Sequence, residues 1–243
     1  ELLDIPYVGT GVLGSALGMD KAMAKNVLAS CAIPQPRFRS LRAHLVTPSL
    51  LTDVIDDLGL PLFVKPANMG SSVGVSKVSN REQMASAVEH ALRYDEWVVC
   101  EEAIVGREIE VAVLGNLHPE ASVPGEIIPG NDFYDYEDKY VTDGAHLVIP
   151  AELDSARANE VRALALRVFD VLRCEGLARV DFFYEPDGRG FLCNEVNTMP
   201  GFTPISMYPK LWQASGVAYP ELIDRLVQLA LERHARRRRD TAR

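Results

Sequence analysis

Apolar and polar residues alternate with a period of two in several short stretches of the chain, which is the spacing expected of β-strands. The stretch REIEVAVLG (107–115) alternates strictly, and Ile109, Val111 and Val113 share one face of the strand that it predicts. Shorter strands are predicted at LPLFVKP (60–66), VGVSKV (73–78) and WVVCEE (97–102).

Segments with helical spacing separate these strands. Residues 20–30 predict a helix with Asp20 as its N-cap, and Asn80 with Gln83 resembles a capping box at the start of a second helix. A long helix is predicted over 155–175, ending at Gly176. Helices that pack on antiparallel hairpins indicate an α+β fold in two lobes.

Two segments show no apolar period. Residues 129–146 are rich in aromatic and acidic side chains, as in FYDYEDKY (133–140), and we expect them to form a lid that closes over a ligand. The basic stretch 234–243 is predicted to be a disordered, solvated tail.

Composition excludes some classes of protein. The chain has 243 residues, of which 47% are hydrophobic and 24% charged, as in an ordinary globular protein. Its net charge of −9 argues against a general nucleic-acid binder, because neutralising phosphates requires a basic face. No apolar run reaches the length of a membrane span, so we expect no membrane partner. The four cysteines form no C-x-x-C pair, which favours buried free thiols and a cytoplasmic location.

Candidate chemistry is concentrated in LARVDFFYEPDGRGFLCNEVNTMPG (177–201), which is predicted to form a hairpin. Period two places Cys193, Glu195 and Asn197 on one face of its second strand. If the turn centres near Gly188, Asp181 faces Glu195 and Arg179 faces Asn197. Two facing carboxylates repel one another unless a cation lies between them, and oxygen ligands suit Mg²⁺. The alternative is a solvated strand face on which Arg179 neutralises Asp181.

The stretch KPANMGSSVGVSKV (65–78) joins two predicted strands through a turn rich in glycine and serine. Its backbone N–H groups can form an anion-binding nest, with Gly70 and Gly74 allowing close approach of a phosphate and Lys65 supplying a charge. A plain hairpin turn is the alternative. Lys21 lies in the first turn of a helix, where the helix dipole disfavours a cation. Such a cation is favourable if it binds an anion together with the N-terminus of the helix.

The segment EEAIVGREIE (101–110) places carboxylates beside apolar residues. Its strand backbone could hydrogen-bond an adenine edge, and one of its glutamates could bind ribose hydroxyls. An acidic, solvent-facing strand is the alternative.

Five stretches together resemble the D-alanine–D-alanine ligase family of the ATP-grasp superfamily, and the resemblance runs from Glu1 to about Arg233. The stretches are MDK (19–21), KPANMGSSVGVSKV, FYDYEDKY, LARVDFF (177–183) and NEVNTMPGFTPISMYPK (194–210). The resemblance implies the end of an N-terminal domain at 1–19, a central lobe at 20–104 and a C-terminal lobe at 105–233 with the mobile loop 129–146. ATP is then gripped between the two lobes.

The resemblance also implies a role for individual residues. Lys21, Lys65 and Lys139 are expected on the phosphates. Glu101 and the Ile104 backbone are expected on adenine, and Glu108 on the ribose. Asp181, Glu195 and Asn197 are expected to bind two Mg²⁺, with Glu195 bridging and Mn²⁺ as a substitute. The oxyanion is expected to be stabilised by Arg179 and the Gly201 N–H. The residues expected to position two D-alanines are Ser71, Tyr134, Tyr140 and Ser206, with Tyr134 also near the nucleotide.

The implied reaction makes D-alanyl-D-alanine for peptidoglycan through an acyl phosphate. In this family a preceding domain supplies a glutamate for the first D-alanine and contributes the usual homodimer contacts. The resemblance leads us to expect that residues 1–19 are the last piece of that domain and that the complete protein is a homodimer. Three alternatives remain: another ATP-grasp carboxylate–amine ligase, a D-alanine–D-lactate ligase, and a nucleotide-binding module without turnover.

Overall fold

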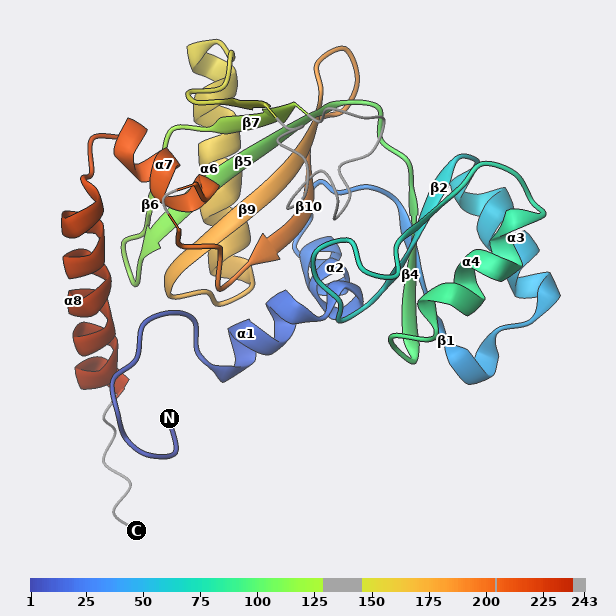
Figure 1. The fold of residues 1–243 in the computed structure, drawn as a ribbon, viewed down its shortest axis with the longest axis horizontal. Helices are drawn as coiled ribbons and strands as arrows, with labels where there is room; N and C mark the ends of the chain where they lie inside the picture. The colour runs from blue at the N-terminus through green and yellow to red at the C-terminus, as the bar shows by residue number, and fades with distance from the viewer. Residues whose placement is uncertain (129–145, 204, 238–243) are drawn as a thin grey trace.

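The computed structural model describes residues 1–128, 146–203 and 205–237, which form two lobes (Figure 1). The smaller lobe contains a four-stranded sheet in the order β1-β4-β2-β3. Its strands are β1 (Phe38–Arg42), β2 (Leu62–Pro66), β3 (Ser76–Val78) and β4 (Trp97–Glu102). A short 3-10 turn, η1 (Ala43–Leu45), follows β1. Helices α3 (Pro48–Leu58) and α4 (Gln83–Ala91) share one apolar core with this sheet.

The larger lobe contains a six-stranded sheet in the order β10-β9-β5-β7-β8, with β6 paired to β5. Its strands are β5 (Arg107–Gly115), β6 (Glu120–Ala121), β7 (Gly125–Ile128), β8 (His146–Val148), β9 (Gly176–Glu185) and β10 (Gly190–Asn197). Helix α6 (Ser155–Val171) covers one face, and α7 (Met207–Ala214) and α8 (Tyr219–Arg237) cover the other (Figure 1).

Strand β5 has the two faces that its alternation predicts. Ile109, Val111 and Val113 lie in the core under α6, whereas Ala112 and Leu114 lie in the core under α7 and α8. All strand pairings that the structure describes are antiparallel, and the α+β prediction is confirmed.

Helices α1 (Val12–Met19) and α2 (Lys21–Ser30) connect the N-terminal segment to the space between the lobes (Figure 1). Asp20 caps α2 as predicted, since its carboxylate accepts a hydrogen bond of 2.9 Å from the Met23 N–H. Ala22 packs against the smaller sheet, and Leu28 lies in the core of the larger lobe. Helix α2 therefore contacts both lobes.

The predicted hairpin forms between β9 and β10, and its predicted register is confirmed where the polar residues lie. Glu195 pairs with Asp181, and Asn197 pairs with Arg179. The placement of Cys193 on the same face as Glu195 is wrong, because the register shifts between these two residues and Cys193 pairs with Phe182. One additional residue in a strand reverses the faces of all the residues beyond it. Cys193 therefore lies in the core under α6.

Two other details differ from the sequence prediction. Helix α6 ends at Val171 rather than at residue 175, because Arg173 adopts a left-handed conformation with φ of 54°. Cys100, Cys174 and Cys193 are buried free thiols as expected, but Cys31 is exposed.

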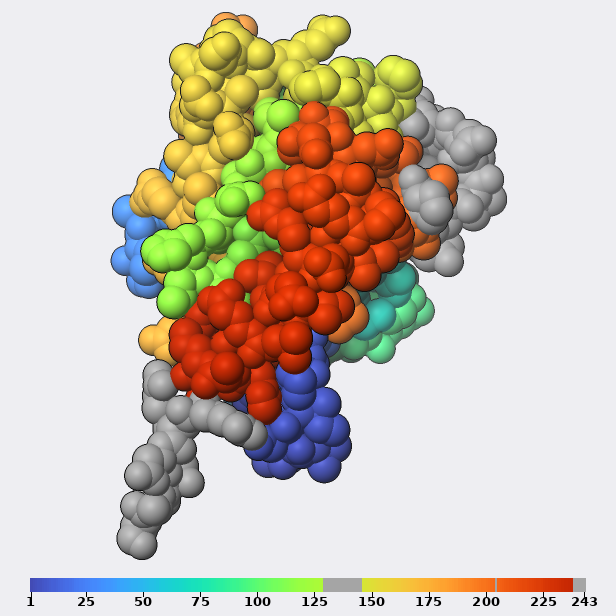
Figure 2. All heavy atoms as spheres, turned by 90° about the vertical axis from the view of Figure 1, so that its left-hand side faces the viewer, coloured from blue at the N-terminus to red at the C-terminus, as the bar shows by residue number. Residues whose placement is uncertain are grey.

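The predicted disordered tail begins too early. Helix α8 continues to Arg237, so residues 234–237 are helical, while 238–243 lie outside the described residues. Arg233 is only 3% exposed: it donates hydrogen bonds to the backbone oxygens of Gly9 and, at 3.1 Å, Tyr7. Figure 2 shows the N-terminal segment against α8. A search for local apolar periodicity cannot detect hydrogen bonds between residues so far apart in the chain.

Replacing Arg233 by Ala should lower the free energy of unfolding by about 2–3 kcal/mol, because it leaves two backbone oxygens without their charged donor. Arg157→Ala is the matched control: Arg157 makes an exposed ion pair with Glu160, and its loss should leave the stability nearly unchanged because solvent screens such a pair. Urea denaturation of the two variants measures both values. Equal stabilities would mean that the end of α8 does not hold the N-terminal segment.

Candidate functional site

A cavity of about 420 Å³ lies between the two lobes. Residues from β2, β3, β4, β5, β7 and β9 line it together with the connection from β4 to β5. Among the predicted nucleotide-binding residues, the cavity brings together Lys65, Glu101, Ile104 and Glu108. Arg107 and Glu126 close one side through a bidentate pair of 2.7 and 2.6 Å.

A buried ion cluster forms the inner wall of this cavity. The Glu101 side chain accepts hydrogen bonds from Lys25 at 3.1 Å and from Lys65 at 2.9 Å, and Glu101 is 1% exposed. Burial alone would raise the pKa of the Glu101 carboxyl, but the two ammonium groups outweigh burial and hold that pKa below its usual value. The sequence analysis missed Lys25, although it lies one helical turn after Lys21 and so on the same face of α2.

Lys21 connects α2 to the glycine-rich loop. Its ammonium group donates a hydrogen bond to the backbone oxygen of Met69. Burial lowers the pKa of Lys21, while the charge of Glu195 opposes this shift. Lys21 therefore lies near both the predicted phosphate loop and the predicted metal ligands.

The glycine-rich loop joins β2 to β3, as predicted, in an uncommon backbone conformation. Ser71 and Ser72 have φ of 51° and 59°, in the left-handed region that non-glycine residues rarely occupy. Gly74, with φ of 72°, is required for internal packing, because a Cβ there would lie 2.6 Å from Tyr94 and 2.7 Å from Pro66. Around Gly70 a Cβ would meet no atom within 4 Å, so the loop is open on that side.

The predicted metal ligands lie together on β9 and β10. Asp181, which is 8% exposed, pairs with Glu195 and accepts a hydrogen bond of 2.9 Å from the Asn197 amide. Arg179 forms a bidentate pair with Asp181, with two N···O distances of 2.8 Å, and lies 3.0 Å from Glu110. Burial alone would lower the pKa of the Arg179 guanidinium, but Asp181 and Glu110 raise it well above its usual value.

These residues fit a hard divalent cation by the chemistry of their donors, which are carboxylate and amide oxygens. Within the described residues there is no group of three or more His, Cys, Asp and Glu side chains that could hold a metal ion. The predicted set has only two carboxylates, with Asn197 as the third ligand. The ion pair of Arg179 with Asp181, which was the alternative in the sequence analysis, is present.

The remaining predicted residues divide into two groups. Gly201 and Ser206 lie close together after β10, since a Cβ on Gly201 would be 2.9 Å from the Ser206 hydroxyl. The Ser206 hydroxyl is also 2.8 Å from that of Thr203. Tyr134, Lys139 and Tyr140 lie outside the described residues, as does the predicted lid except for His146, which is in β8.

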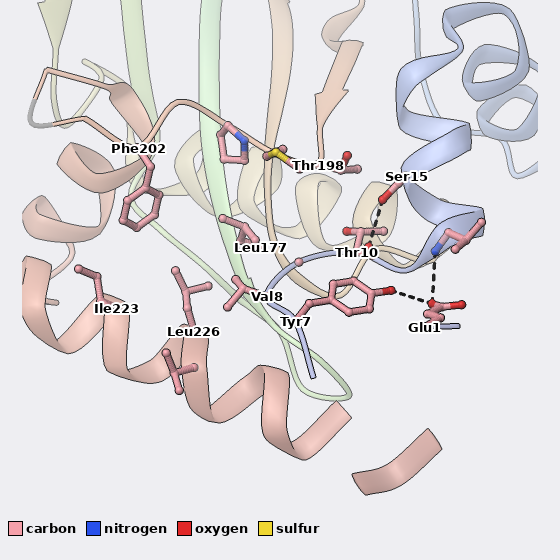
Figure 3. Close-up of a pocket in the computed structure, with 15 residues that line it drawn as sticks. Glu1, Tyr7, Val8, Thr10, Ser15, Leu177, Thr198, Phe202, Ile223 and Leu226 are labelled. Atoms are coloured by element: carbon pink, nitrogen blue, oxygen red, sulfur yellow. Dashed lines mark hydrogen bonds between the residues drawn. The ribbon is translucent and has the colours of Figure 1, made fainter. Parts of the chain in front are cut away.

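A second cavity, of about 800 Å³, lies between the N-terminal segment and the larger lobe (Figure 3). The N-terminal segment, the start of β9, the segment after β10 and α8 line it, with largely apolar side chains such as Leu177, Phe202 and Leu226. No local pattern in the sequence indicated this cavity, because its walls come from segments that lie far apart in the chain.

Comparison with known proteins places these features in one family. A family model described as "D-ala D-ala ligase C-terminus" matches residues 27–228. The D-alanine–D-alanine ligase of Oceanobacillus iheyensis is 51% identical over 237 residues, which are 97% of this chain and 64% of that protein. The corresponding ligase of Geobacillus kaustophilus is 52% identical, again with 64% of its length covered. The chain thus spans just under two thirds of these relatives.

Solved structures agree. The D-alanine–D-alanine ligase from Coxiella burnetii has a TM-score of 0.87 at 40% identity, with 97% of this chain and 63% of that chain covered. The D-Ala:D-Ser ligase VanG from Enterococcus faecalis has a TM-score of 0.86 at 34% identity, with 94% and 66% covered.

Replacing Gly74 by Ala should lower the free energy of unfolding by about 1–3 kcal/mol, because the new methyl group combines a left-handed backbone with overpacking. Gly70→Ala in the same loop is the control and should change stability by less than about 0.5 kcal/mol, since nothing lies near its Cβ. Thermal unfolding measures both. If the two variants lose the same stability, the loop does not adopt the conformation described.

Proposed function

The chain belongs to the D-alanine–D-alanine ligase family, and from that premise we propose that it forms the ATP-binding and catalytic part of a ligase that joins two D-alanines. The product is D-alanyl-D-alanine for peptidoglycan synthesis. The observation that carries the proposal is the cavity between the lobes, where Lys65, Glu101 and Glu108 come together as the family resemblance requires.

The nucleotide lies in this cavity. The Glu101 carboxylate and the Ile104 backbone bind adenine, Glu108 binds the ribose, and Lys21 and Lys65 bind the phosphates. Three lysines (Lys21, Lys25 and Lys65) lie near one buried carboxylate, Glu101, so this region favours an anion. Lys65 leaves Glu101 when it binds phosphate.

Asp181, Glu195 and Asn197 would hold magnesium ions, which prefer oxygen donors of this kind. When bound, the metal would neutralise charge on the phosphate oxygens. Asp181 would then bind the metal in place of Arg179, and the Arg179 guanidinium would stabilise the carbonyl oxygen of the reacting D-alanine. The Gly201 N–H supports the same oxyanion.

The reaction has two steps. A carboxylate oxygen of the first D-alanine attacks the γ-phosphorus of ATP, the bond to the β–γ bridging oxygen breaks, and ADP leaves. The amine of the second D-alanine then attacks the acyl carbon, the bond to the phosphate oxygen breaks, phosphate leaves, and the amine loses a proton. Neither step requires a side-chain nucleophile, so positioning and charge stabilisation carry the catalysis.

The D-alanines are positioned by Ser71 and Ser206, together with Tyr134 and Tyr140. Lys139 joins the phosphates.

None of the helices within the described residues is long and apolar enough to cross a bilayer.

The test of the proposed function is ADP release in the presence of D-alanine. It is measured on this chain alone and on the chain joined to the upstream region of a longer relative. We expect the joined form to release one ADP per D-alanyl-D-alanine formed, with the product identified by mass. Equimolar D-lactate should compete poorly. ADP release that does not depend on D-alanine, or an ester as the main product, would contradict the proposal.

Two substitutions distinguish a metal site from a purely structural ion pair. Glu195→Gln should weaken Mg²⁺-dependent ATP binding at least about 10-fold while leaving the stability of the ligand-free protein unchanged or higher, because it removes like-charge repulsion. Asp181→Asn should weaken the same binding and also cost about 1–3 kcal/mol of stability, because Arg179 loses its bidentate partner.

Isothermal titration with ATP, at several Mg²⁺ concentrations, measures the first effect, and urea denaturation measures the second. If Glu195→Gln binds ATP as well as the unmodified chain at every Mg²⁺ concentration, Glu195 is not a metal ligand.

A further inference from the structure

Lys25 is the buried cation of the inter-lobe junction to which neither the family resemblance nor the reaction gives a role. It lies on α2 and is 2% exposed, and it is not among the residues that line the cavity. Its ammonium group contacts the Glu101 carboxylate at 3.1 Å and lies 5.6 Å from the centre of the Phe38 ring. A lysine so deeply buried loses its hydration, and its retention calls for a specific partner.

The two lysines that bind Glu101 lie on opposite sides of the carboxylate. Lys25 holds Oε1 from the interior, whereas Lys65 holds Oε2 from the cavity wall. The Lys25 side chain is 3% exposed and that of Lys65 is 15% exposed. Lys65 can therefore move toward a ligand, whereas Lys25 is confined by the packing around it.

We propose that Lys25 is a positioning residue that determines base specificity: it keeps Glu101 ionised and oriented after Lys65 has moved to the phosphates. Oxygen Oε2 is then free to accept a hydrogen bond from the base while Oε1 stays on Lys25. An ionised carboxylate only accepts hydrogen bonds, so it favours a base with an amino group at this position and repels one with a carbonyl oxygen. This inference rests on the proposed function, in which Glu101 contacts the base.

Without Lys25, the departure of Lys65 would leave the Glu101 carboxylate buried and without either of the ammonium groups that hydrogen-bond it. Lys21 acts on Glu101 only through its charge, and in the proposed function it binds the phosphates. A carboxylate in that state takes up a proton, because burial penalises the charged form. A protonated carboxyl group can donate as well as accept, so it no longer distinguishes a 6-amino purine from a 6-oxo purine. The ammonium group of Lys25 prevents this loss of selectivity.

The experiment compares the binding of ATP and ITP to this chain. These nucleotides differ in the amino or oxo group at position 6 and in the proton that hypoxanthine carries on N1, and the N1 difference is the same for the unmodified chain and its variants, so a change in the ratio between them reports the contact at position 6. Inorganic triphosphate is a third ligand that has phosphates but no base. The variant is Lys25→Met, which keeps an unbranched side chain one heavy atom shorter and removes the ammonium group with its charge. Lys210→Met is the control, because Lys210 lies on α7 and does not line the cavity. Circular dichroism and thermal unfolding verify the fold of each variant.

We expect the ratio of the ITP and ATP dissociation constants to fall about 10-fold in Lys25→Met, which corresponds to the loss of one hydrogen bond to a charged group. Triphosphate binding should change less than about 3-fold, and Lys210→Met should keep the original ratio. If Lys25→Met does not fold, Lys25→Gln replaces it, because glutamine keeps a donor for Glu101 without the charge. The same fall in the ratio is expected for that variant.

The outcomes separate the inference from its premise. If the unmodified chain binds neither nucleotide, the proposed function fails, and the role of Lys25 fails with it. If the unmodified chain prefers ATP and the Lys25 variants keep that preference, Lys25 is only a structural ion pair and this inference alone is overturned. Equal weakening of ATP, ITP and triphosphate would overturn it in the same way.

Discussion

Burial of the Glu101 carboxylate at the junction of the two lobes is the constraint on which the rest of the site depends. A charge that is 1% exposed is tolerated only with cations beside it, because an unpaired buried ion costs several kcal/mol. These cations come from α2 and β2, so the ion cluster fixes α2 against the smaller sheet. The other face of α2 packs in the core of the larger lobe through Leu28. Helix α2 thus contacts both lobes, and the buried carboxylate fixes its position against the smaller one.

Lysines and acidic residues are concentrated in different parts of the junction. The smaller lobe and α2 contribute lysines, whereas the β9–β10 hairpin and β5 contribute Asp181, Glu195 and Glu110 around Arg179. Apolar residues of similar volume in place of buried ion pairs often stabilise a protein, so stability alone does not explain this concentration of charge. The proposed nucleotide with divalent cations would explain it, because lysines suit an anion and carboxylates suit cations. In that proposal the ion pairs hold each group until its ligand binds.

Sequence reasoning succeeded where the information is local. The period of β5 gave its two faces, and counting from a turn at Gly188 paired Asp181 with Glu195. It failed where distant segments meet or where one residue interrupts a period. The register shift before Glu195 moved Cys193 to the opposite face, and Arg233 is held by carbonyl oxygens more than two hundred residues earlier in the chain. Lys25 was not predicted because a lysine on a helix usually faces solvent. Only the position of Glu101 in the fold shows that Lys25 has a buried partner.

Helix α2 also connects the two ends of the proposed nucleotide site. Lys21 holds the glycine-rich loop through the Met69 carbonyl, and Lys25 holds the carboxylate that faces the base. Four residues of α-helix advance about 6 Å along the axis, and this spacing is rigid because the backbone hydrogen bonds of the helix fix it. Ser71 and Ser72 hold left-handed conformations that cost about 1–2 kcal/mol each, so the loop needs such an external anchor. The separation between the proposed phosphate loop and Glu101, the proposed contact to the base, is therefore set by a helix. This helix is stiffer than either of the segments that are proposed to contact the ligand.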